Sequence, residues 1–158
     1  MNTPRPTLYP DLASHVAAVL AEMDDIPAER KAVLERLAGP VRVRTATGEI
    51  AKLTFICTHN SRRSQMAQIW AQGAAQYFGV PRVETFSGGT EATAFNPRAV
   101  AALERAGFRI DTPEEEENPV YRVRYTDDKD AMECFSKAYD QPPNPKQDFV
   151  AVMTCSQA

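Results

Sequence analysis

Hydrophobic residues recur at helical spacing through the first fifty positions of the chain. The stretch DLASHVAAVLAEM carries five of them on one helical face: Leu12, Val16, Val19, Leu20 and Met23. A second helix is predicted in DDIPAERKAVLERLAGP, where Pro27 suits the first turn and Gly39-Pro40 ends the helix. We therefore assign residues 1–50 to an N-terminal helical extension, a hairpin of two helices that serves packing or dimer formation.

The pattern changes in the middle of the chain to compact apolar runs that alternate with helices. One run is AKLTFIC, residues 51–57, which is typical of a buried parallel strand, and RVETFSGG is a second strand. Helical periodicity appears in SQMAQIWAQGAAQYFG and again in NPRAVAALERAG, with Asn96 as cap, Pro97 first and Gly107 after the last turn. This β-α-β-α order predicts an α/β fold with a parallel sheet.

The last third of the chain is less regular. A half-exposed strand is predicted in VYRVRY, where large apolar residues alternate with arginines. The acidic run Glu114–Glu117 is interpreted as a solvated loop or first helical turn. A last compact strand is predicted in DFVAVMTC, ending at Cys155. Together with the middle of the chain, these segments predict one α/β domain over residues 51–158.

Composition and charge narrow the class of protein further. The chain has 158 residues, 43% of them hydrophobic, and a net charge of -3, which suits one globular domain without attraction to nucleic acid. No apolar run approaches the roughly 20 residues that span a bilayer, and the first residues lack the apolar core of a secretory signal. Three scattered cysteines predict reduced thiols and a cytoplasmic location.

The junction FICTHNSRRS, between the first compact strand and its following helix, concentrates reactive and basic residues. Cys57 ends the strand, and five residues separate it from Arg63. The N–H groups of such a loop and the positive end of the helix form an anion cradle, which lowers the pKa of a thiol inside it. A guanidinium at this position grips a tetrahedral oxyanion through two parallel hydrogen bonds. The spacing Cys-x5-Arg-Ser is the signature of cysteine-dependent phosphatases.

Three stretches resemble the low-molecular-weight protein tyrosine phosphatase superfamily, and especially its thioredoxin-coupled arsenate reductase branch. The first is FICTHNSRRSQMAQIWA, which is similar to the opening Cys-Thr-Gly-Asn-Ser-Cys-Arg-Ser-Gln-Met-Ala of that branch. The second is FSGGTEATAFNPRAVAALERAGFRI, where a strand end leads to an Asn-Pro helix start, and the third is DFVAVMTCSQA, similar to a strand ending in Cys-x-x-Ala. The resemblance covers residues 51–110 and 148–158 and implies a three-layer parallel sheet.

The resemblance implies a role for most residues of the loop. Cys57 is the nucleophile, Arg63 clamps the oxyanion, Asn60 holds the shape of the loop, and Ser64 donates its hydroxyl to the thiolate. The whole oxyanion-binding set is Thr58, His59, Asn60, Ser61, Arg62, Arg63 and Ser64. Arg62 departs from the family because a cysteine is common there; it either adds positive field or points to solvent. His59 stands where glycine is common and is interpreted as a surface residue.

The resemblance leaves two chemistries open. A phosphatase needs a general acid, which in the family is the Asp of an Asp-Pro pair, and this sequence contains no such pair. A reductase needs a second thiol to attack the Cys57–arsenate adduct and a third to resolve the disulfide. Cys155 matches the second thiol, so it favours an arsenate reductase coupled to thioredoxin. Cys134 matches no family position and is interpreted as structural, with resolving thiol as the alternative.

The implied substrates are arsenate, phosphate or a phosphoprotein, without a cofactor, a metal, a membrane or nucleic acid. Because the last strand and helix of the family are missing, we expect a fragment of a longer enzyme. The alternatives are a natural short form that binds oxyanions without turnover, and a partner chain that completes the sheet. A metal site of Cys57, His59 and Cys155 is a weaker hypothesis, because Cys-x-His lacks the usual ligand spacing of two to four residues.

Overall fold

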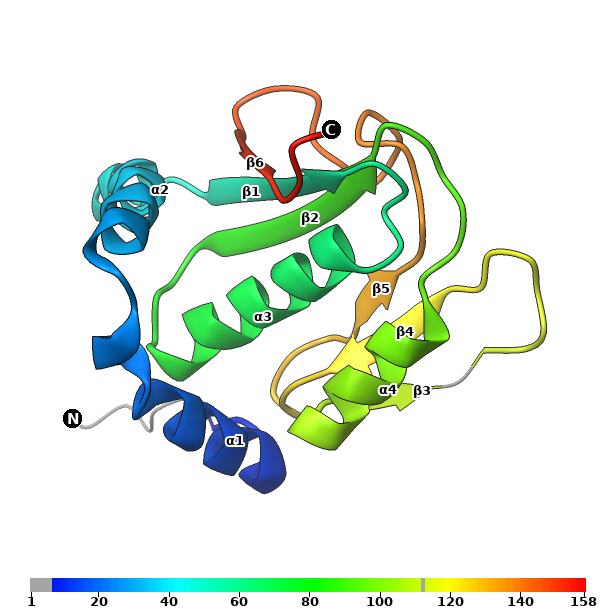
Figure 1. Ribbon diagram of the computed structural model, residues 1–158, viewed down its shortest axis with the longest axis horizontal. Helices are drawn as coiled ribbons and strands as arrows, with labels where there is room; N and C mark the ends of the chain where they lie inside the picture. Colours follow the sequence, from blue (N-terminus) through cyan, green and yellow to red (C-terminus); the bar gives the residue numbers. More distant parts are fainter. Residues whose placement is uncertain (1–6, 112) are drawn as a thin grey trace.

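The computed structural model describes residues 7–111 and 113–158, and its centre is a parallel sheet of three strands (Figure 1). β1 (Ala51–Cys57) lies between β2 (Val83–Gly89) and β6 (Val150–Met153), and both neighbours run parallel to it. Nearly every residue of β1 is buried, as its unbroken apolar run predicts. The predicted α/β class with a parallel sheet is confirmed.

The helix α3 (Arg63–Tyr77) packs on β1 and β2 and buries polar as well as apolar residues. Its apolar face joins the main core, where Ile69 is fully buried. On another face, Gln68 Nε2 donates to the carbonyl of Thr85 at 3.0 Å, and Gln72 Oε1 accepts from the Thr85 N–H at 3.1 Å. These glutamines therefore satisfy backbone groups on the outer edge of β2, which no other strand of this sheet pairs.

The main hydrophobic core lies between helices and a second, antiparallel sheet. That sheet consists of β3 (Arg109–Asp111), β4 (Tyr121–Arg124) and β5 (Met132–Cys134), in that spatial order. The predicted half-exposed strand is confirmed as β4, with Val123 pointing into the core. Its partners were not predicted, because strands of three residues carry no measurable periodicity. Side chains at the centre of the core are Leu12, Ile69, Phe95, Leu103, Val123 and Cys134.

Both predicted N-terminal helices are present, but they do not lie side by side as a hairpin. α1 (Pro10–Leu20) packs against α4, whereas α2 (Ala28–Ala46) contacts β1 (Figure 1). A short 3-10 turn, η1 (Met23–Asp25), lies between them. The apolar face of α1 is drawn into the main core through Leu12, and α2 buries none of its residues. Residues 1–6 of the assigned extension lie outside the described residues.

α2 also runs past Gly39-Pro40, where the sequence predicted its end. Proline removes one N–H from a helix, and on an exposed helix the carbonyl that loses its partner is solvated instead of buried. The helix continues to Ala46 and stops at the turn-forming pair Thr47-Gly48, where Gly48 has a φ of 78°. The turn chemistry was therefore a better boundary signal than the internal proline.

The helix α4 (Pro97–Ala106) has the caps that its sequence predicts. The Asn96 side chain accepts the Arg98 N–H at 3.0 Å, and Gly107 adopts a left-handed conformation with a φ of 107°. A side-chain carbon on Gly107 would overlap the backbone of Leu12 at the first turns of α1. The glycine thus ends α4 and also lets α1 approach it closely.

Replacing Gly107 with alanine should destabilise the protein for both reasons. We expect Gly107→Ala to lower the free energy of unfolding by at least about 2 kcal/mol, since it adds left-handed strain and a backbone clash. Gly39→Ala is the matched control, because Gly39 lies inside α2 with open space around it. That change should leave the stability equal or up to about 1 kcal/mol higher. Urea unfolding measures both, and equal effects would contradict the prediction.

Candidate active site

The site lies at the carboxyl end of the parallel sheet, where ligands bind in open α/β folds. β1 ends at Cys57, α3 begins at Arg63, and a five-residue loop connects them. Asn60 in this loop is fully buried and has a φ of 47°, a left-handed conformation that asparagine tolerates. Gly89 is the neighbour of Cys57 on β2. A side-chain carbon there would overlap the carbonyl of Thr58, so glycine lets the loop fold over the strand end.

A chain of hydrogen bonds leads from Asn60 to the thiol. Asn60 Nδ2 donates to Ser64 Oγ at 2.8 Å, and Ser64 Oγ lies 3.0 Å from Cys57 Sγ. Because the Ser64 oxygen accepts from the amide, its own hydrogen is free to point at the sulfur. The carboxamide of Asn60 thus orients the Ser64 hydroxyl as a donor to Cys57.

These donors change the acidity of the thiol. Burial raises the pKa of Cys57, but hydrogen bonds from the Ser64 hydroxyl and from backbone N–H groups outweigh it, so the pKa lies below its ordinary value. The N–H groups belong to Ser64, Asn60 and Ser61. A sulfur held in this way is a thiolate at a lower pH than a free cysteine, and the thiolate is the reactive form.

The loop surrounds a pocket of about 280 Å³. Its lining residues are Cys57, His59, Ser61, Arg62, Arg63, Thr93 and Asn96. The two arginines are exposed and make the rim strongly basic. Of the predicted set, Asn60 and Ser64 lie buried behind the thiol, and Thr58 also stands outside the lining. The pocket therefore combines a buried sulfur with positive charge, which suits an anionic ligand.

Cys155 lies on the other side of Thr58. β6 ends at Met153, earlier than predicted, so Cys155 sits in the turn after the strand and is half-buried. Its sulfur is 3.7 Å from Thr58 Oγ1. The Thr58 hydroxyl and the N–H of Gln157 lower the pKa of Cys155, and the positive charge of Arg63 acts in the same direction. Both thiols of the predicted pair thus have a lowered pKa.

Cys134 has a different environment from the other two cysteines. It is completely buried in the main core, and burial raises its pKa to about 12. Such a thiol is neutral and unreactive at physiological pH. The interpretation of Cys134 as a structural residue is confirmed, and its use as a resolving thiol would require the core to open.

His59 has a partner that the sequence did not reveal. Its Nε2 lies 2.7 Å from Glu91 Oε1, and more than half of each side chain is exposed. The interpretation as a surface residue is confirmed, although His59 also lines the pocket. His15, on the distant α1, stacks on Trp70 and takes no part in the site.

Sequence reasoning also missed Thr93 and Asn96 in the pocket wall. The N–H of Asn96 donates to the carbonyl of Ser61 at 2.8 Å, which ties the start of α4 to the loop. The sequence did contain a signal for this contact. The segment that crosses the pocket lies between the Gly-Gly-Thr end of one strand and the Asn-Pro start of the next helix. The helix cap was recognised, but its second contact depends on tertiary packing.

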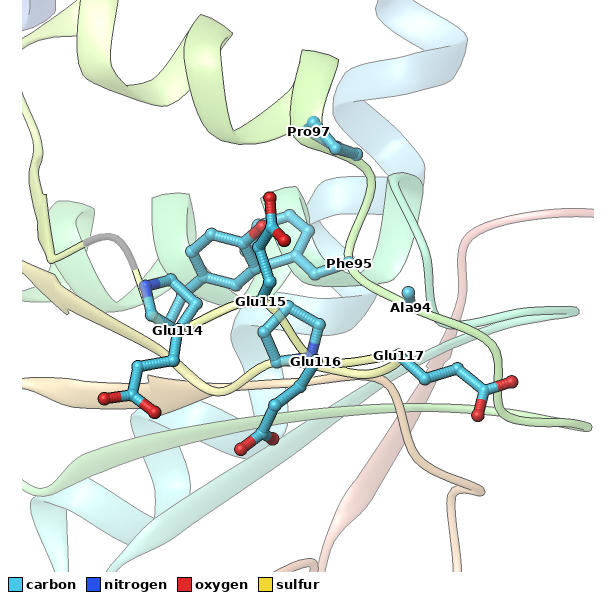
Figure 2. Close-up of a pocket in the computed structure, with 10 residues that line it drawn as sticks. Ala94, Phe95, Pro97, Glu114, Glu115, Glu116 and Glu117 are labelled. Carbon is cyan, nitrogen blue, oxygen red and sulfur yellow. The ribbon is translucent and has the colours of Figure 1, made fainter.

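A larger pocket of about 600 Å³ lies on the other side of the segment Thr93–Pro97. Figure 2 shows Phe95 and Pro97 in its wall, together with the side chains of Glu114–Glu117. The predicted acidic run is exposed, as a solvated loop should be. Neither Cys57 nor an arginine lines this pocket. Its negative charge would repel an oxyanion, so the smaller basic pocket is the candidate site.

Within residues 7–111 and 113–158, no three His, Cys, Asp or Glu side chains gather in a way that could hold a metal ion. Cys57, His59 and Cys155 therefore do not form the metal site considered as an alternative. Within the same residues, no helix is both long and apolar enough to cross a membrane.

Known proteins resemble this chain around the loop. Residues 52–121 match the family model of low molecular weight phosphotyrosine protein phosphatase. Over 56 residues the chain is 46% identical to the arsenate reductase of Bacillus subtilis, 45% to that of Brevibacillus brevis and 43% to arsenate reductase 2 of Staphylococcus haemolyticus. These stretches cover 35% of this chain and 37%, 39% and 40% of the respective relatives, so well under half of each relative is matched.

The lowered pKa of Cys57 can be tested through Ser64. We expect Ser64→Ala to raise the pKa of the thiol, since it removes a hydrogen bond to a charged sulfur. Ser61→Ala is the matched control, because Ser61 contributes its backbone N–H, which alanine keeps. The rate of Cys57 alkylation by iodoacetamide as a function of pH gives the pKa, measured in a Cys155→Ser background. An unchanged pKa in Ser64→Ala would refute the assigned hydrogen bond.

Proposed function

We propose that this chain belongs to the low molecular weight phosphotyrosine protein phosphatase superfamily, whose family model matches residues 52–121, and that it performs cysteine-dependent chemistry on a tetrahedral oxyanion. Cys57 is the nucleophile in this proposal, and Arg63 is the clamp for the anion. The supporting observation is a buried thiol that receives a fixed hydroxyl and three N–H groups, in a pocket with two arginines. Such a sulfur ionises at a lower pH than a free cysteine, and it lines a pocket that a small anion can enter.

In the first step, the Cys57 thiolate attacks the central arsenic or phosphorus atom of the bound oxyanion. A bond forms from sulfur to that atom, and one oxygen leaves with its electron pair and takes up a proton. Arsenate loses water in this step, and a phosphate monoester loses its alcohol. The remaining oxygens carry the charge, which the guanidinium of Arg63 and the N–H groups of the loop stabilise.

We favour arsenate reduction because a second thiol with a lowered pKa lies beside the loop. The Cys155 thiolate attacks the sulfur of the Cys57–arsenate adduct and forms a disulfide. The electron pair of the sulfur–arsenic bond passes to arsenic, which leaves as arsenite. Arsenic gains two electrons, and the two thiols lose them. A thioredoxin-type dithiol would then reduce the disulfide, as the resemblance to the coupled branch implies.

Hydrolysis of phosphate monoesters is the second candidate, because the matched family consists of phosphatases and the first step is identical. Water would then cleave the Cys57–phosphate bond, without any need for Cys155. The second thiol therefore separates the two chemistries. The predicted cytoplasmic location, with its reducing conditions, fits either one. A homodimer through the N-terminal helices also stays a prediction, supported by the exposed side chains of Val33 and Leu34 on α2.

Three variants of the 158-residue chain test the proposal. Two assays are run on each: arsenate reduction coupled to thioredoxin, thioredoxin reductase and NADPH, and hydrolysis of p-nitrophenyl phosphate. Cys57→Ser should abolish whichever activity the wild type has. Arg63→Ala should lower it about 10²–10³-fold, since an oxyanion donor is removed. Cys155→Ser should abolish arsenate reduction and leave phosphate hydrolysis intact.

Arg105→Ala serves as the control for the loss of a positive charge. Arg105 lies on the exposed face of α4, outside the lining of the oxyanion pocket, and the variant should retain full activity. Vanadate binding is measured in parallel. Binding that depends on Arg63 without turnover in either assay would favour the non-catalytic oxyanion-binding module. Loss of neither binding nor activity in Arg63→Ala would contradict the assignment of the clamp.

A further inference from the structure

The chain that follows β5 returns to the strand ends at the site, although it lies outside the segment shared with the family (Figure 1). The N–H of Gly89 donates to the carbonyl of Lys137 at 2.9 Å, and the N–H of Tyr139 donates to the carbonyl of Gly89 at 2.9 Å. A side-chain carbon on Gly88 would overlap the backbone of Tyr139. Residues 135–139, which we call the bracing segment, are therefore packed directly against the end of β2.

One hydroxyl of the bracing segment joins two walls of the oxyanion pocket. Ser136 is only 2% exposed. Its Oγ donates to the carbonyl of His59 at 2.8 Å and accepts the N–H of Thr93 at 2.8 Å. His59 belongs to the loop after β1, and Thr93 belongs to the segment before α4. Both residues line the pocket, so Ser136 fixes the spacing between its two sides without touching the ligand space.

The backbone of Ser136 is itself held by a single side chain. Asn118 Nδ2 donates to the carbonyl of Ser136 at 2.7 Å, and the N–H of Ser136 donates to Asn118 Oδ1 at 3.2 Å. Through these two bonds, the Asn118 carboxamide pairs with the Ser136 backbone as a neighbouring strand would. Asn118 thus determines where the Ser136 hydroxyl lies. The two residues form one series of hydrogen bonds, from Asn118 through Ser136 to the carbonyl of His59 in the loop.

The residues on either side of Ser136 are linked to Asn60 of the loop, Lys137 directly and Phe135 through Gln65 of α3. The N–H of Lys137 donates to Asn60 Oδ1 at 3.0 Å. Gln65 Nε2 donates to the carbonyl of Phe135 at 2.8 Å and also lies 3.1 Å from Asn60 Oδ1. Because Asn60 Oδ1 is occupied by these donors, its Nδ2 faces Ser64. The bracing segment therefore sets which way the carboxamide of Asn60 is turned.

We propose that Ser136 and Asn118 are positioning residues of the oxyanion loop, which hold its N–H groups and the Ser64 hydroxyl in line with Cys57. The inference rests on the proposed function, since it assigns them to the same site. Neither side chain touches the reacting atoms. Their effect passes through His59 and Thr93 on one side and through the orientation of Asn60 on the other.

The test compares Ser136→Ala, Asn118→Ala and the double variant in a Cys155→Ser background of the full chain. The readouts are the pKa of Cys57 from iodoacetamide alkylation, the dissociation constant for vanadate, and stability in urea. Each single variant should weaken vanadate binding about five- to tenfold and raise the pKa of Cys57, because ordered donors are lost from the loop. The double variant should be little worse than either single one, since both residues act along one path.

Ser87→Ala is the matched control. Ser87 is also fully buried, but its hydroxyl has no hydrogen-bond partner among residues 7–111 and 113–158, and its removal should leave both the pKa and the affinity unchanged. If the Ser136 and Asn118 variants lose stability but keep the wild-type pKa and affinity, the proposal is overturned. Wild-type protein that fails to bind vanadate would instead refute the proposed function, and the thiol pKa would still decide the role of Ser136. If Ser136→Ala does not fold, Asn118→Ala provides the same comparison.

Discussion

The hydrogen-bond chain from Asn60 through Ser64 to Cys57 is the interaction on which the site depends. A buried thiolate is costly unless donors are already in place around it. The left-handed backbone of Asn60 turns the loop, and its carboxamide orients the Ser64 hydroxyl toward the sulfur. Burial alone would raise the pKa of this thiol, as it does for Cys134 in the main core. The pKa values of the two cysteines are thus shifted in opposite directions within one small domain. The difference arises because fixed hydrogen-bond donors surround Cys57.

The rest of the fold positions the residues of this hydrogen-bond chain. The central strand β1 places Cys57 at the carboxyl end of the parallel sheet, and the positive end of α3 faces the same point. The Gly88-Gly89 end of β2 permits two close approaches, one by the loop and one by the bracing segment. The antiparallel sheet, which encloses the main core, ends in that bracing segment. Packing in the core and order in the loop are therefore linked through a short stretch of backbone.

Much of this arrangement was predictable from local chemistry. The strand at residues 51–57, the capped helix after Asn96 and the reactive loop each have a signal within a few neighbouring residues. Three features had no such signal. The helix through Pro40 depends on solvent exposure, the buried glutamines of α3 depend on the free edge of β2, and the role of Ser136 depends on a partner 77 residues away. Long-range polar contacts have no period, so a pattern of apolar residues cannot reveal them.

The most direct measurement is the pKa of Cys57 in an Asn60→Gly variant with Cys155 replaced by serine. Glycine keeps the left-handed backbone and removes only the carboxamide. If that amide orients the Ser64 hydroxyl, the pKa of the thiol should be higher in this variant than in the protein with Asn60. A pKa equal to that of the parent would contradict the hydrogen-bond chain, because it would show that the Ser64 hydroxyl donates to Cys57 without the amide of Asn60.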